Sequence, residues 1–199
     1  VGPGESNLRR RALALELATI AWNVLEGILA IVAGLLAGSV ALVAFGLDSS
    51  VEVFASAVVV WELRGVDRRR ERRAVRAIGA AYFVVAVYIL LDSGNALRIA
   101  NRPEASPIGM VLLAATVLVM AALGIAKLRV GRELRSATVT ADGRFSLVDG
   151  SLAGAVLAGL ALTAVLGWWW ADALLAIGIS LVAFREGREA WIGREPETT

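Results

Sequence analysis

Two carboxylates, Asp48 and Glu52, lie near the middle of an apolar stretch, residues 37–63, that is long enough to cross a bilayer. Residues four apart in a helix lie on one face, about one turn from each other. A charged side chain at the centre of a bilayer costs about 2.5 kcal/mol or more. Two acids on one stripe of a span therefore indicate a polar partner, and we expect a cation bound inside a membrane protein.

The composition of the whole chain is typical of a membrane protein. It has 199 residues, of which 58% are hydrophobic and 19% are charged, and its mean hydropathy is +0.71. Because a spanning helix needs about 20 residues, this length admits about six spans joined by short turns. We predict an all-α integral membrane protein with a single transmembrane domain over residues 1–199 and no soluble domain.

The sequence contains no cysteine and no histidine, which excludes disulfides, thiolate ligands and imidazole ligands. A metal ion would therefore be bound by oxygen, which suits Mn²⁺ or Mg²⁺ best and accepts Zn²⁺ or Fe²⁺. An enzyme is not expected, since there is no constellation of nucleophile and base and no exposed domain to hold one. The arginines lack interleaved aromatic residues, so we expect no nucleic-acid partner.

Apolar runs predict six spans, separated by polar or basic segments. They cover residues 12–37, 39–63, 74–96, 108–126, 137–166 and 170–186. A tight turn at Gly38–Ser39 joins the first two spans, and a solvated basic loop over residues 64–76 follows the second. The fourth span is expected to end at Lys127, and Trp168 to Trp170 indicate an interfacial aromatic belt before the sixth.

The basic residues predict the orientation of the chain in the membrane. Most of the 20 Lys and Arg residues lie at the N-terminus, in the loops after the second and fourth spans, and in the C-terminal tail. Lys127 is counted in the loop after the fourth span, whereas Arg98 and Arg102 alone follow the third. The positive-inside rule then predicts that both termini are cytoplasmic. We expect a multi-pass protein of the cell inner (plasma) membrane.

Polar residues of the first and fifth spans extend the candidate site. Asn23 and Glu26 share a face of the first span, and a rise of about 1.5 Å per residue places Glu26 at about the depth of the acidic pair in the second. In the fifth span, Asp142, Phe145 and Asp149 follow an i, i+3, i+7 pattern, which predicts that they line one face. The first, second and fifth spans could therefore present their acids to one cavity.

Carboxylates that converge in a poorly solvated pocket repel one another unless a cation balances their charge. Metal ions and protons compete for such a site, which is the physical basis of a metal/proton exchanger. The expected substrate is a divalent metal ion, zinc or manganese before others, and we expect no further cofactor. The candidate metal ligands are Asp48, Glu52, Asp149, Glu26, Asn23 and Asp142.

Several of these residues also have a purely structural interpretation. Buried acids can be satisfied by hydroxyls or water between helices, and an Asn/Glu pair can bond helices together without contacting substrate. Asp142, near Arg144 and the cytoplasmic edge, fits an interfacial or entry-path residue better than a ligand. Asp172, at the start of the sixth span, fits a helix N-terminal acid. Asp92 is expected near the outer end of the third span.

The motifs resemble those of the cation diffusion facilitator (cation efflux) family. The similarity lies in A-G-S-V-A-L (37–42) and L-D-S-S-V-E (47–52), in A-D-G-R-F-S-L-V-D (141–149) and in W-W-W-A-D-A-L (168–174). It covers all six spans in order and points to a short, six-span form without the cytoplasmic C-terminal domain. The resemblance implies proton-coupled efflux of divalent transition-metal cations by alternating access, and a homodimer.

In that family, two acidic turns each supply a pair of ligands to a site between the second and fifth spans. By this resemblance Asp48, Glu52 and Asp149 match ligands, whereas Phe145 occupies the fourth ligand position and cannot bind a metal. The open position would be filled by water or by another polar side chain. The candidates for this substitution are Asn23, Glu26 and Asp142.

Two other functions are consistent with the same residues. A metal-binding or scaffold membrane protein with no transport cycle would follow from the loss of the ligand at Phe145. A transporter of organic cations could use the acids as counter-charges, with aromatic residues along its path. The aromatic residues concerned are Phe45, Phe54 and Phe145.

Overall fold

The computed structural model describes residues 3–63 and 68–192. This part of the chain contains six helices and no strand, so the predicted all-α class is confirmed. The helices are α1 (Pro3–Ala37), α2 (Val40–Leu63), α3 (Arg68–Arg98), α4 (Pro107–Leu134), α5 (Ala137–Leu166) and α6 (Trp169–Ile192).

Within the described residues, five helices, α1 to α5, are long and apolar enough to cross a membrane. The helix α6 falls short of this measure because its apolar centre is bounded by Asp172 near one end and by a charged run, residues 185–189, near the other. The sixth predicted segment is therefore a helix, and its passage through the membrane stays a prediction.

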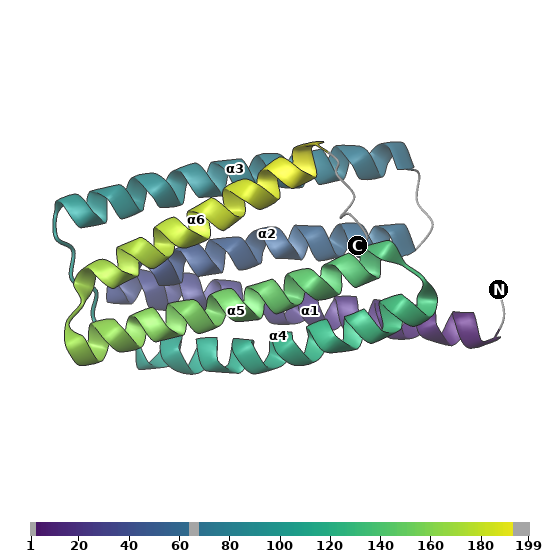
Figure 1. Ribbon diagram of the computed structural model, residues 1–199, viewed down its shortest axis with the longest axis horizontal. Helices are drawn as coiled ribbons and strands as arrows, with labels where there is room; N and C mark the ends of the chain where they lie inside the picture. The colour runs from purple at the N-terminus through teal and green to yellow at the C-terminus, as the bar shows by residue number, and fades with distance from the viewer. Residues whose placement is uncertain (1–2, 64–67, 193–199) are drawn as a thin grey trace.

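The helices form three closely packed pairs, α1 with α2, α4 with α5, and α3 with α6. Figure 1 shows them side by side, with successive helices running in alternating directions along the long axis of the bundle. The first two pairs join neighbours in the sequence through short turns. The third pair joins helices that are far apart in the sequence.

Glycines bring the helices of the first two pairs into backbone contact. A Cβ atom added at Gly46 of α2 would lie 2.8 Å from the carbonyl oxygen of Gly27 in α1. A Cβ atom added at Gly124 of α4 would lie 2.8 Å from the carbonyl oxygen of Gly143 in α5. Small residues at such positions allow helices to approach closely. We therefore treat α1–α2 and α4–α5 as two tightly packed helix pairs.

The helix α2 is the centre of the bundle. It packs against α1, α3, α5 and α6, and 65% of its most apolar stretch is buried, against 22–39% in the other four candidate spans. This is the helix that carries Asp48 and Glu52. A central position removes both acids from the lipid-facing surface, which their charge makes necessary.

The turn between α1 and α2 is tied to the start of α6. Gly38 adopts a positive φ of 65°, which a tight turn requires, as predicted. Asp172, in the first turn of α6, accepts hydrogen bonds from the hydroxyl of Ser39 (2.5 Å) and from the backbone N–H groups of Val40 (2.8 Å) and Ala41 (3.3 Å). The acid predicted to favour its own helix N-terminus thus also satisfies the first turn of α2.

Two segments predicted as loops are helical in the structure. The helix α4 does not end at residue 126 but continues to Leu134, before Ser136 caps α5, so Lys127 lies inside a helix. The helix α3 begins at Arg68, within the predicted basic loop. The first residues of that loop, 64–67, lie outside the described part of the chain.

We expect Gly46→Ala to lower the free energy of unfolding by about 1–3 kcal/mol, because the added methyl group overpacks the contact with α1. The measurement is the thermal unfolding of the purified protein in detergent.

Gly94→Ala in α3 is the matched control, because apart from its own helical turn no atom of the described residues lies within 4 Å of the Cβ position there. Its unfolding free energy should stay unchanged or rise slightly, since alanine favours a helix more than glycine does. Equal losses in the two variants would contradict the close packing of α1 against α2.

Candidate metal centre

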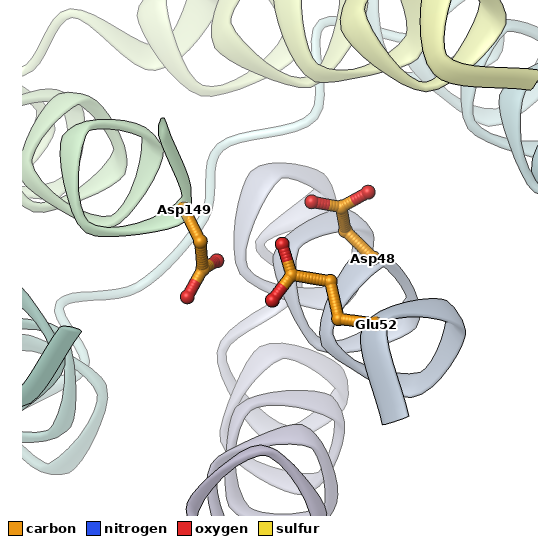
Figure 2. A group of neighbouring side chains, drawn as sticks. All are labelled: Asp48, Glu52 and Asp149. Atoms are coloured by element: carbon orange, nitrogen blue, oxygen red, sulfur yellow. The ribbon is translucent and has the colours of Figure 1, made fainter. Parts of the chain in front are cut away.

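Three carboxylates from two helices form a cluster in the interior of the bundle. Asp48 and Glu52 lie on successive turns of α2, and Asp149 lies on α5. One oxygen from each lies within 4.8 Å of the other two. Figure 2 shows Asp149 pointing from α5 toward the two side chains of α2. The structure thus brings together the three residues that the family resemblance matches to ligands.

The cluster is poor in compensating groups. Asp149 is fully buried, and neither of its carboxylate oxygens has a hydrogen-bond partner among the described residues. Asp48 is 4% exposed, and Glu52 is partly buried. Three carboxylates at this separation repel one another in a medium of low dielectric constant. A bound cation or bound protons would remove that repulsion.

The spacing of the oxygens is close to what a shared metal ion needs. Carboxylate oxygens bind Zn²⁺ at about 2.0–2.2 Å, so two oxygens on one ion lie at most about 4.4 Å apart. The three oxygens lie within 4.8 Å of one another, which is close to that separation.

Asn23 of α1 is the predicted supplementary residue that contacts the cluster. Its amide Nδ2 donates a hydrogen bond of 2.9 Å to Oε2 of Glu52. Asn23 is fully buried, and its Oδ1 has no hydrogen-bond partner among the described residues. The amide therefore orients Glu52 and leaves one oxygen without a partner beside the carboxylates.

Glu26 is held away from the cluster by hydroxyl groups. Its Oε1 accepts a hydrogen bond of 2.8 Å from Ser49, and its Oε2 accepts one of 2.6 Å from Thr116 on α4. Trp22 in turn donates to the Thr116 hydroxyl at 3.3 Å. Because both carboxylate oxygens are engaged, Glu26 fits the interhelical interpretation, with α1, α2 and α4 joined at one point.

Asp142 also lies outside the carboxylate cluster, since it forms an ion pair with Lys127 of α4. Lys127 is fully buried and contacts Glu16 of α1 at 3.0 Å. The prediction that Lys127 is a loop cation is therefore wrong, because α4 continues past it. Glu16 was not among the predicted residues, although an acid inside the first predicted span was a signal of the same kind as Glu26.

Phe145 does not share the buried face of α5. It is 43% exposed, whereas Asp142 and Asp149 are buried, so Phe145 is not enclosed with the two acids. Gly143 and Ser146 are the buried residues between the two acids. The fourth ligand position of the family is therefore partly exposed in this structure. Arg144 is exposed as well.

The three phenylalanines proposed to line a path for an organic cation differ in their exposure. Phe45 is fully buried in the main apolar core. Phe54 is 62% exposed, and Phe145 is also exposed.

The fold and the cluster define a helical integral membrane protein with a candidate cation site between α2 and α5. Residues 17–191 match the cation efflux transmembrane domain. The chain therefore belongs to the cation efflux family.

Three curated relatives show the extent of the similarity. The magnetosome protein MamB of Magnetospira sp. is 26% identical over 169 residues, which are 79% of this chain and 57% of that protein. Transmembrane protein 163 of Xenopus laevis is 24% identical over 76% of this chain and 55% of its own length. An uncharacterized transporter of Synechocystis sp. is 26% identical over 71% of this chain and 49% of its own length.

The chain thus spans about half to three fifths of the length of the relatives that it matches.

Two buried aspartates allow a matched test of the cluster's electrostatics. In metal-free detergent, Asp149→Asn should raise the free energy of unfolding by about 0.5–2 kcal/mol, a common gain for a stabilising substitution, because it relieves repulsion at a carboxylate that has no donor among the described residues. Asp172→Asn should lower it by about 1.5–3 kcal/mol, because three donors lose a charged acceptor.

Chemical unfolding of both variants beside the wild type measures the two changes. If both substitutions change the stability in the same direction, the assignment of an uncompensated charge to Asp149 is wrong.

Proposed function

We propose that this protein exports divalent transition-metal cations of the zinc, manganese and iron class from the cytoplasm in exchange for protons. Membership of the cation efflux family supports transport of metal cations in general. The observation that carries the proposal is the buried cluster of Asp48, Glu52 and Asp149, in which Asp149 has no hydrogen-bond partner among the described residues. The protein acts as a transporter and not as an enzyme.

The donor set favours particular ions. Three carboxylates and the amide oxygen of Asn23 form an oxygen-only set of four, with Asn23 as the substitute for the ligand lost at Phe145. Zn²⁺ accepts four ligands that include carboxylates, and Mn²⁺ prefers oxygen. Zinc and manganese are therefore the first candidates as substrate.

Proton exchange follows from the charge of the same atoms. A divalent cation binds to the deprotonated carboxylates, and its departure leaves three buried negative charges close together. Protons that bind to these oxygens remove the repulsion and prevent the cation from binding again. Because cation and protons occupy the same oxygens in turn, their movements are coupled.

The position of the cluster supports alternating access. Asp48 and Glu52 belong to the pair α1–α2, and Asp149 belongs to the pair α4–α5. Each pair is held by glycine contacts, so the two pairs can move relative to each other with little internal change. Such a movement would expose the cluster to one side of the membrane and then to the other.

The orientation and assembly are part of the same proposal. Both termini lie in the cytoplasm and the chain resides in the inner or plasma membrane, because the basic residues favour this topology. The excess of basic residues on the cytoplasmic side persists when the buried Lys127 is not counted, because Arg129, Arg132 and Arg135 remain on that side. The homodimer is proposed from the family resemblance.

The test is cation uptake into proteoliposomes under an imposed pH gradient, with Zn²⁺, Mn²⁺, Fe²⁺ and Mg²⁺ compared. We expect the pH gradient to drive cation uptake. Asp48→Ala should lower the uptake rate by at least about 10–100-fold, since substituting even a residue that only hydrogen-bonds to a metal ligand lowers metal affinity or activity by this much.

Asp92→Asn is the control, because Asp92 is an acid of α3 outside the cluster. It should transport like the wild type. Cation binding in detergent without flux would replace the transporter by a metal-binding scaffold. Inhibition of flux by an organic cation that is itself carried would favour the organic-cation transporter.

A further inference from the structure

A second buried charge cluster joins α1, α4 and α5. The ammonium group of Lys127 contacts Oε2 of Glu16 at 3.0 Å, pairs with Asp142 and lies 3.4 Å from the hydroxyl of Ser146. The side chains of Glu16 and Lys127 are 0% exposed, and that of Asp142 is 10% exposed. We call these three charged residues the Lys127 triad.

The charges of the triad do not balance. Two carboxylates share one ammonium group, which leaves one negative charge in excess if both acids are ionised. Asp142 and the Ser146 hydroxyl also contact the ammonium group, and Oε1 of Glu16 has no hydrogen-bond partner among the described residues. An uncompensated buried charge costs several kcal/mol even after relaxation. One proton on the two carboxyl groups would make the triad neutral.

The triad lies about two helical turns from the cation cluster along α1 and α5. Glu16 precedes Asn23 by seven residues on α1, and Asp142 precedes Asp149 by seven residues on α5. This step is about 10 Å along each helix. In Figure 1 both helices run in the same direction, so the triad lies closer than the cation cluster to the end where α1 begins.

We propose that the Lys127 triad is a proton-binding site separate from the cation ligands, in which Glu16 and Asp142 share one proton while Lys127 stays charged. The carboxylates of the cation cluster do not belong to this site. The nearest of them along α5, Asp149, lies about two turns farther on.

The place of the triad between the two helix pairs gives the proton a role in exchange, which rests on the proposed function. Glu16 belongs to α1–α2, whereas Lys127 and Asp142 belong to α4–α5. When the pairs separate at this end, Glu16 leaves Lys127, water enters, and the shared proton passes to water. The remaining Lys127–Asp142 pair is neutral. A bound proton therefore favours closure of this end, and its release favours opening.

Infrared difference spectra of the full chain in lipid nanodiscs at pH 7 test the site without any transport. Glu16→Gln should remove the carbonyl band of one protonated carboxyl group. Glu104→Gln, at an exposed glutamate of the segment between α3 and α4, is the control and should remove a carboxylate band instead. A loss of carboxylate in both variants would overturn the proposal.

Lys127→Met gives the opposite signature and guards against a misfolded Glu16 variant. Without the ammonium group, both carboxyl groups should be protonated, so the carbonyl band should increase. A spectrum with an unchanged carbonyl band would overturn the proposal.

The coupling role is measured in the proteoliposomes as protons moved per cation. Glu16→Gln should carry one proton fewer per cation than the wild type, and an unchanged ratio would overturn this role. If the wild type moves no cation, the proposed function fails, while the infrared result still decides whether the triad binds a proton.

Discussion

A charge buried inside a membrane protein has to be compensated within the protein, because lipid offers no hydrogen bonds. The chain meets this requirement in three ways. Asp172 accepts donors from the start of α2, Glu26 accepts two hydroxyl groups, and Lys127 pairs with acids of two other helices. Asp149 has less compensation than these charges, since neither of its oxygens has a donor in the described part of the chain. The unmet requirement at Asp149 is what makes the cluster a candidate site for a cation.

The arrangement of the helices relates the uncompensated charge of the carboxylate cluster to the proposed transport. Glycine contacts hold α1 to α2 and α4 to α5, and the cation cluster and the Lys127 triad both join one pair to the other. A movement of the pairs would therefore change both sites together. The hydrogen bond that the Thr116 hydroxyl of α4 donates to Glu26 of α1 crosses the same interface.

Phe145 departs from the family pattern, because it places a phenyl ring at a ligand position. The phenyl ring is partly exposed and offers no atom that binds a cation as a ligand. The amide of Asn23 contacts the cluster from α1 and brings an oxygen that a phenyl ring lacks.

The sequence by itself determined the all-α class and the pairing of Asp48 with Glu52, because hydropathy and four-residue spacing are local properties of a helix. It also indicated Asp149 through its family motif. Only the tertiary structure decided that Asn23 contacts Glu52, that Glu26 does not join the cluster, and that α4 continues through a buried Lys127. Periodicity defines which residues share a face, but the packing and rotation of whole helices decide which faces meet.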